Sequence, residues 1–332
     1  MFTESRDRNS SKTATGVLAS TSTQTPALSV LEVQAAAAYA RAEKAPATRR
    51  AYRTDFGRFR AWCGERGTEA LPAAPETVAA FLAFEAGRGV KPSTIGRRVA
   101  SIRYAHKLAG RTLPTDGERV RATLRGIRRS LQTAPTRKAP ATADKIMAMA
   151  PIGRERLSNL RDRALLLVGF AGAFRRSELV ALNVDVVEEM AEGLRINIRH
   201  SKTDQEGRGD VIAIPRGAIA CPVEALMTWL TVAGITTGPV FRPIAKGGRI
   251  QDNRLTDRSV SQIIKIHAAR VGLESTEFSG HSLRSGFLTS AAARGASIFR
   301  MADQSRHKSM DVLRGYVRNA EIFRDHAGAG LL

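Results

Sequence analysis

Four consecutive stretches of the chain repeat apolar residues at the spacing of an α-helix. They span residues 48–67, 75–87, 93–110 and 118–132. In the first, the apolar side chains from Tyr52 to Cys63 follow one another at spacings of four, three and four, which places them on one helical face. An Ala-rich segment over residues 28–44 is also expected to be helical. The sequence therefore predicts a small all-helical domain over residues 28–131.

The outer faces of these helices are basic. The candidate DNA-contacting residues are Arg49, Arg50, Arg53, Arg97, Arg98, Arg103, Lys107, Arg121, Arg125, Arg128 and Arg129. A single basic face is more often only solvated. Several such faces with almost no glutamate partners favour contact with the DNA backbone.

The net charge of the chain indicates the same partner. The 332 residues include 52 Lys and Arg against 31 Asp and Glu, a formal charge of +21. Residues 1–135 hold 23 basic and 11 acidic side chains, so the excess is not confined to one end. A charge of this sign and spread favours a polyanion. Anionic lipid is the weaker alternative, because no helix pairs a basic face with exposed Trp or Phe.

Cysteine content and hydropathy indicate the cellular compartment in which the protein is expected. Cys63 and Cys221 lie far apart, with no CxxC or His/Cys cluster, so neither a disulfide framework nor a zinc site is indicated. The longest apolar run, residues 164–174, is well short of the roughly 20 residues that a membrane span needs. The N-terminus has no signal-peptide stretch. We expect a cytoplasmic, nucleoid-associated protein with no membrane partner.

Composition divides the chain further. Residues 1–27 are rich in Ser and Thr and are expected to form a disordered tail. Residues 132–141 contain two prolines together with Arg137 and Lys138, two further candidate DNA contacts, and are expected to form an extended basic linker. In residues 142–332, helical patterns surround one predicted β-hairpin, LRINIRH and DVIAIP. The fold class expected is mainly α with a small β-sheet, the second domain being mixed α/β.

Cofactor chemistry is not indicated by any motif. The chain lacks a GxxxxGK[ST] loop and the spaced acidic set of a two-metal nuclease. Phosphoryl chemistry would then depend on side-chain cations and hydrogen-bond donors. We expect no cofactor and no metal.

Three motifs in the second domain supply such groups. Arg175 follows an apolar helix in GAFRRSEL, where a lone arginine would be only a helix terminus. His281 and Arg284 are three residues apart on a predicted helix and could converge on one ligand, although HxxR alone is weak. His307 lies in RHKS, and Tyr316 follows nine residues later in RGYVR. A lone tyrosine is usually a half-buried packing residue.

Taken in order, these motifs resemble the tyrosine recombinase, or phage integrase, family of site-specific DNA recombinases. The matching residues are Arg175, Lys202 in HSKTDQ, His281, Arg284, His307 and Tyr316. The resemblance covers about residues 48–332, because the basic helical domain is similar to the family's SAM-like core-binding domain. Phe174 and Arg306 depart from the family's usual Leu and Gly. The resemblance implies the simple two-domain type, without an arm-binding domain.

The resemblance implies how the DNA strand would be cut. Arg175 and Arg284 would bind the scissile phosphate, and Tyr316 would attack it to form a covalent 3′-phosphotyrosyl link. Lys202 would protonate the leaving 5′-oxygen, although a β-turn lysine is more often only solvated. No ATP would be required.

The remaining matched residues would assist. His281 would take or share the tyrosine proton, His307 would donate a hydrogen bond to the phosphate, and Glu178 would brace the site. The spacing to Ser177-Glu178-Leu179 favours Arg175 over Arg176 as the arginine that enters the site.

The family also implies an assembly. Double-stranded DNA with inverted-repeat sites would be bound by a homotetramer with a dimer on each site, alone or with a sister recombinase. Strand exchange would pass through a Holliday junction. The last helix, after Tyr316, would dock on a neighbouring protomer, the alternative being that it packs on its own subunit. Two rival functions stay open: a catalytically silent DNA-binding relative, and relaxation of DNA in the manner of a type IB topoisomerase.

Overall fold

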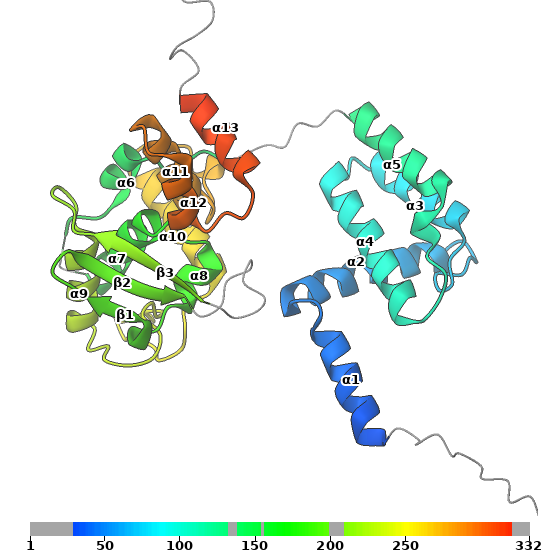
Figure 1. Cartoon of the computed structure of the whole chain (residues 1–332), viewed down its shortest axis with the longest axis horizontal. Coiled ribbons are helices and arrows are strands. Elements are labelled where there is room, and N and C mark those ends of the chain that lie inside the picture. Colours follow the sequence, from blue (N-terminus) through cyan, green and yellow to red (C-terminus); the bar gives the residue numbers. More distant parts are fainter. Residues whose placement is uncertain (1–28, 132–137, 154–155, 199–208, 321–332) are drawn as a thin grey trace, which may run out of the picture. The chain divides into compact units, whose positions relative to one another are not determined.

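The computed structural model describes residues 29–131, 138–153, 156–198 and 209–320. The chain divides into two compact units, residues 1–135 and 136–332 (Figure 1). The predicted tail, Arg137, Lys202 and the residues after Ala320 lie outside the described residues.

The described part of the first unit is all-helical. Its elements are α1 (Val30–Ala42), α2 (Pro46–Gly64), α3 (Pro75–Gly87), α4 (Pro92–Leu108), the 3-10 turn η1 (Pro114–Asp116) and α5 (Glu118–Leu131). Proline opens α2, α3 and α4, where its fixed φ suits the first helical position. Helix α2 packs on α4 and α3 packs on α5. Their shared core includes Phe59, Phe81 and Ile95, all buried.

One predicted DNA contact of this unit is wrong. The sequence pattern places Arg98 on the outer face of α4, but its side chain is only 5% exposed. It pairs with Glu85, and its Nε lies 3.8 Å from Oδ1 of Asp55. A buried charge needs such partners, because its hydration is lost. Arg98 therefore belongs to the interior of the helical unit.

Acidic partners are also more common than the sequence suggested. Arg97 pairs with Asp55 at 2.6 Å, Arg103 with Asp116, and Arg125 with Glu118. The expectation of almost no glutamate partners is therefore wrong for Arg125, and it did not consider the aspartates that pair with Arg97 and Arg103. All three nevertheless remain exposed, as do Arg50, Arg53, Lys107, Arg121, Arg128 and Arg129, whereas Arg49 is half-buried.

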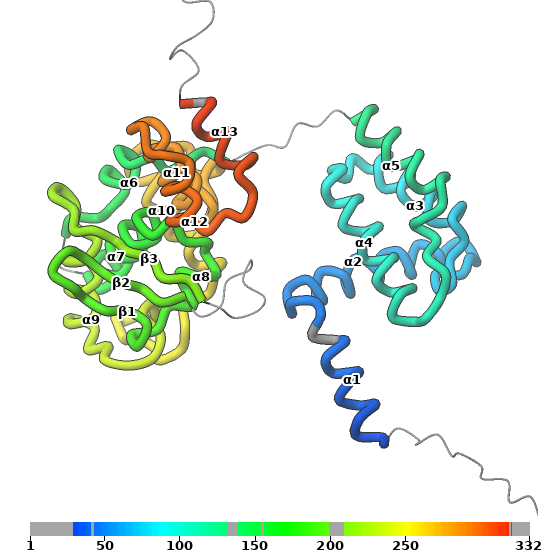
Figure 2. The backbone as a smooth tube through the Cα atoms, viewed as in Figure 1, coloured from blue at the N-terminus to red at the C-terminus, as the bar shows by residue number. Residues whose placement is uncertain are grey.

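In its described residues the second unit combines helices with one small sheet, so the predicted fold class is confirmed. The helices are α6 (Ala143–Met149), α7 (Leu157–Ala171), α8 (Arg176–Ala181), α9 (Pro222–Val232), α10 (Asp257–Arg270), α11 (Ser282–Ala293), α12 (Ile298–Ser305) and α13 (Met310–Ala320), with 3-10 turns η2 (Val184–Val186) and η3 (Ser275–Glu277). Helix α7 is buried at the centre and packs on α9 and α11. Helices α11, α12 and α13 pack on one another, which is visible in the orange-to-red part of the tube in Figure 2.

The sheet is antiparallel, in the order β1-β2-β3. Strands β2 (Gly193–Ile198) and β3 (Asp210–Pro215) are the predicted hairpin, in a register that pairs Ile196 with Ile212. Alternate residues of β2 are buried, which is the pattern that predicted the strand. Strand β1 (Val187–Glu189) was not predicted and pairs with β2.

Part of the predicted linker is packed on the second unit. The backbone amide of Ala139 donates to the carbonyl of Glu277, and that of Ala141 donates to the carbonyl of Ser282, both at 2.9 Å. Ala141 is fully buried, and a Cβ added to Gly286 would lie 1.8 Å from its carbonyl oxygen. Residues 138–141 therefore belong to the second unit and lie against the start of α11.

Candidate active site

Arg175 and Glu178 are held together at the start of α8. Arg175 is the residue before the helix, and the carboxylate of Glu178 accepts its backbone N–H at 3.0 Å. The same carboxylate accepts Nη1 of Arg175 at 2.5 Å. Arg176 instead pairs with Asp257 at 3.2 Å and is exposed. This geometry brings Arg175, and not Arg176, beside the buried carboxylate.

Arg284 joins α11 to the turn between α7 and α8. Its side chain is 1% exposed, and its Nη1 donates to the carbonyl of Ala173 at 2.8 Å. Its Nη2 lies 3.2 Å from Nδ1 of His307, which follows α12. Residues far apart in the sequence therefore converge on one guanidinium.

The contact with Arg284 fixes the tautomer of His307. A guanidinium can only donate, so Nδ1 of His307 must accept. Burial, followed by the charges of Arg284 and Arg175, lowers the pKa of His307 to about 4. The ring is therefore neutral at pH 7 and carries its proton on Nε2, which is available as a hydrogen-bond donor.

Tyr316 and His281 line one cavity. It measures about 570 Å³ and is also lined by Lys138, Ser285 and Thr289. Tyr316, on α13, is half-buried, and a negative charge on its ionised phenol would raise the pKa of Arg284, so the phenol lies within electrostatic range of that guanidinium. His281 is exposed at the start of α11. The cavity thus brings the predicted nucleophile and its predicted proton acceptor together.

The charges of the site shift several pKa values. Although His281 is exposed, partial desolvation of its ring in the cavity, followed by the cations of Arg284 and Arg175, lowers its pKa. Burial and the charges of Arg175 and Arg306 lower the pKa of Arg284 to about 9, so it remains protonated at neutral pH. Burial alone would raise the pKa of Glu178, but Arg306 and Arg175 outweigh it, and the pKa lies below its usual value.

The sequence did not indicate a role for Arg306. Its side chain is 7% exposed, and its Nη2 lies 2.8 Å from Oε2 of Glu178. The only signal was its place directly before His307, where the family usually has glycine. Of the remaining predicted residues, Lys138 is exposed and donates to the carbonyl of Thr276 at 2.7 Å.

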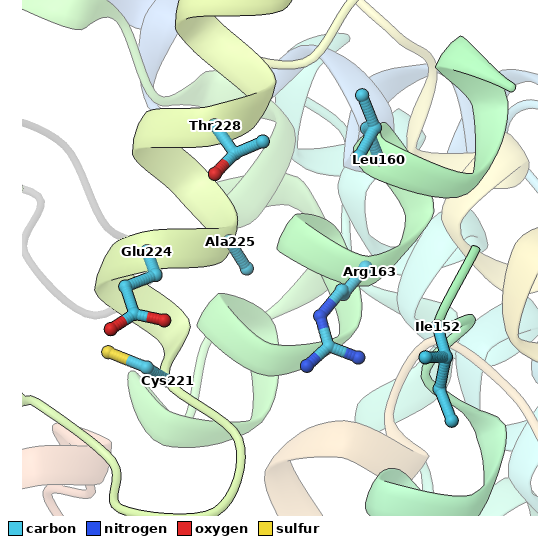
Figure 3. Close-up of a pocket in the computed structure, with 7 residues that line it drawn as sticks. All are labelled: Ile152, Leu160, Arg163, Cys221, Glu224, Ala225 and Thr228. Carbon is cyan, nitrogen blue, oxygen red and sulfur yellow. The ribbon is translucent and has the colours of Figure 1, made fainter. Parts of the chain in front are cut away.

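A second cavity contains none of the predicted site residues. It measures about 220 Å³ and is shown in Figure 3. Leu160 and Arg163 of α7 face Ala225 and Thr228 of α9 across it, with Cys221 at its edge. It is separate from the cluster around Arg284.

Among the residues that the structure describes, no group of three or more His, Cys, Asp or Glu side chains could hold a metal ion. Within the same ranges, no helix combines the length and the hydropathy that crossing a bilayer requires.

Comparison with protein families identifies the class. Residues 139–321 match the phage integrase family, and residues 37–112 match the N-terminal SAM-like domain of phage integrases. The chain therefore belongs to the phage integrase, or tyrosine recombinase, family of DNA strand-transferring enzymes, and the resemblance of its motifs to that family is confirmed.

Two individual recombinases are similar to most of the chain. The chain is 40% identical over 290 residues to the integrase/recombinase xerD homolog of Selenomonas ruminantium, covering 86% of this chain and 85% of that protein. It is 24% identical over 281 residues to the recombinase cre of Escherichia phage P1, covering 79% and 80%.

Solved structures share the fold. The post-cleavage complex of the XerH site-specific recombinase with its palindromic difH substrate matches with a TM-score of 0.57 at 16% identity, covering 78% of this chain and 72% of that one. A lambda integrase dimer bound to a COC′ core site matches with a TM-score of 0.51 at 18% identity, covering 74% and 79%.

Proposed function

We propose that this protein is a site-specific recombinase that cleaves and rejoins DNA through a covalent 3′-phosphotyrosyl intermediate on Tyr316 and a Holliday junction. One observation carries the proposal. The buried guanidinium of Arg284 is fixed between the carbonyl of Ala173 and Nδ1 of His307, and Tyr316 lies within its electrostatic range. Such a preorganised cation suits the charge that develops on a phosphate in the transition state.

The phosphate would be bound by donors from three elements. Arg284 and Arg175 would supply guanidinium N–H groups to its non-bridging oxygens. Nε2–H of the neutral His307 would donate a further hydrogen bond. Because these groups are held by protein contacts before DNA binds, little rearrangement would be needed at the moment of reaction.

The chemical step would exchange one ester for another. The phenolic oxygen of Tyr316 attacks phosphorus, and the bond from phosphorus to the 5′-oxygen breaks. His281 takes the phenolic proton, since its lowered pKa keeps it neutral at pH 7. Lys202 gives a proton to the leaving 5′-oxygen. Attack by the 5′-hydroxyl of a partner strand reverses these steps and reseals the DNA.

The partner would be double-stranded DNA with inverted-repeat sites. The palindromic substrate of XerH and the dimer of lambda integrase on its core site support this. We expect a homotetramer with a dimer on each site, alone or with a sister recombinase, with the segment after Tyr316 docking on a neighbouring protomer. Such an enzyme would act in the cytoplasm, at the nucleoid.

DNA binding would depend on the exposed basic residues of the helical unit. Arg50, Arg53, Arg121, Arg128 and Arg129 remain exposed on α2 and α5. Because each phosphate contact releases counterions, the affinity should fall steeply as salt increases.

The decisive experiment compares the wild type with Tyr316→Phe. The probe is a pool of genomic fragments that carry random single nicks, which trap a cleaved strand. Wild type should form a DNA adduct that survives denaturation, and Tyr316→Phe should form none while it still shifts the same DNA at low salt.

Other outcomes separate the rivals. An adduct with Tyr316→Phe would show that another residue is the nucleophile. No adduct with either protein would favour a silent DNA-binding relative. Relaxation of any supercoiled plasmid by a monomer would favour a topoisomerase.

A further inference from the structure

Arg306 has a backbone conformation that is unusual for arginine. It directly follows α12, with φ 56° and ψ 45°, in the left-handed region. Glycine adopts that region freely, whereas a side chain makes it strained. Among the described residues, only Arg306 and Ala173 have positive φ without being glycine. The two are in contact, because Nη2 of Arg306 lies 3.4 Å from the carbonyl oxygen of Ala173. Strain of this kind persists where surrounding contacts impose it.

The side chain of Arg306 makes those contacts. Its Nη1 donates to the carbonyls of Gln304 at 2.8 Å and Gly172 at 3.3 Å. Its guanidinium carbon lies 5.3 Å from the centre of the Phe174 ring. The buried side chain therefore connects the end of α12 with the turn before α8.

The same guanidinium reaches Arg175 through Glu178. Nη2 of Arg306 binds Oε2 of Glu178 at 2.8 Å, while Nη1 of Arg175 binds Oε1 at 2.5 Å. A carboxylate held at both oxygens has little freedom to rotate. The backbone carbonyl of Arg306 also accepts Nη2 of Arg175 at 3.4 Å. Arg306 thus constrains Arg175 by two routes.

We propose that Arg306 is a positioning residue for strand cleavage: it fixes Glu178, and through Glu178 it orients Arg175 toward the scissile phosphate. This inference rests on the proposed function. It differs from a purely structural role, in which Arg306 would only fill space between α12 and the turn.

The rate of DNA-adduct formation at acidic pH distinguishes these two roles. Glu178 faces Arg175, Arg306 and Arg284, and burial opposes its ionisation. Removing the charge of Arg306 should raise the pKa of Glu178, so Glu178 would protonate at a higher pH and release Arg175. The charge of Arg306 also lowers the pKa of His307, which in turn faces Arg284, Arg175 and His281. Replacing Arg306 by lysine keeps that charge and leaves His307 comparable with wild type.

The test measures single-turnover formation of the DNA adduct across pH. Arg306→Met should slow it by about 10- to 100-fold, as for a misplaced binding group. Its activity should also begin to fall at a higher pH than in wild type as the solution is acidified. Arg306→Lys should recover part of the rate and the wild-type pH profile.

A matched control removes another guanidinium near α8. Nη1 of Arg254 donates to the carbonyls of Val180 at 2.5 Å and Leu182 at 3.2 Å, with no contact to Glu178. Arg254→Met should lower thermal stability while the pH profile of the folded protein stays unchanged. If Arg306→Met fails to fold, Arg306→Gly, which suits the left-handed backbone, takes its place.

The outcomes are distinct. Wild-type rate and pH profile in folded Arg306→Met or Arg306→Gly would overturn the inference and leave the proposed function standing. Equal effects of Arg306→Met and Arg254→Met on the pH profile would also overturn it. If wild type forms no adduct, the proposed function fails, and the inference fails with it.

Discussion

Nη2 of Arg284 lies 3.2 Å from Nδ1 of His307, and this contact orients both side chains. The arginine can only donate, so the histidine accepts and keeps its proton on the opposite nitrogen. The two residues come from α11 and from the segment after α12, and they were predicted separately from two short motifs.

Replacing Arg284 by lysine should slow adduct formation by about 10² to 10³-fold. An ammonium keeps the charge but not the planar fork that reaches Ala173 and His307 at once. Single-turnover kinetics measure the effect. The matched control is Arg176→Lys, which changes an exposed arginine paired with Asp257 and should keep the wild-type rate. Equal rates for Arg284→Lys and wild type would contradict this role.

His307 should titrate far below the usual histidine range. Its pKa is lowered from 6.5 to about 4, so the folded state resists protonation and loses stability as the pH falls from about 6.5 towards about 4. Histidine-ring NMR measures the titration, with His307→Gln identifying the signal. Binding of a short DNA duplex should raise this pKa, because a phosphate offsets the nearby arginines. A midpoint near 6.5 in the free protein would refute the prediction.

Two arginines of α4 should differ sharply in their effect on stability. Arg98→Ala leaves buried Glu85 and Asp55 without their buried partner and should destabilise the helical unit by about 3–5 kcal/mol. Arg103→Ala breaks a pair with Asp116 that is exposed on both sides and should cost about 0.2–1 kcal/mol. Denaturant-dependent hydrogen exchange at the α4 amides measures both. Similar losses in the two variants would show that Arg98 is not structurally distinct.

Gly286→Ala should disturb residues 138–141. The new Cβ would lie 1.8 Å from the carbonyl oxygen of Ala141, so backbone must move, at a cost of about 1–3 kcal/mol. Denaturant unfolding of the full chain measures the loss. Gly153→Ala is the control, because its Cβ meets nothing nearer than Nδ2 of Asn159 at 3.7 Å. An unchanged stability of Gly286→Ala would mean that this segment is not packed as described.

Periodicity predicted most of the helices because their cores repeat at a regular spacing. The stretch 75–87 coincides with α3, and alternation predicted β2 and β3. It could not predict β1, whose three residues show no alternation and become a strand by pairing with β2. Nor could it predict the burial of Arg98, because its partners Asp55 and Glu85 lie on other helices.

The order of short motifs predicted a cluster, and the structure brings Arg175, Arg284 and His307 together. The role of Lys202 stays a prediction, because it lies outside the described residues. Arg306 could not be identified from the sequence, since its contact with Glu178 depends on a left-handed turn that arginine rarely adopts.

Ala173 and Arg306, which both have a left-handed backbone conformation, also limit the stability of the second unit. Ala173→Gly would relieve one of them, and folded protein should tolerate more heat as a result. However, the carbonyl of Ala173 accepts a hydrogen bond from Arg284. A more flexible turn would therefore hold that guanidinium less firmly in place. Selection for thermal stability should therefore favour glycine at position 173, whereas selection for catalytic turnover should favour alanine.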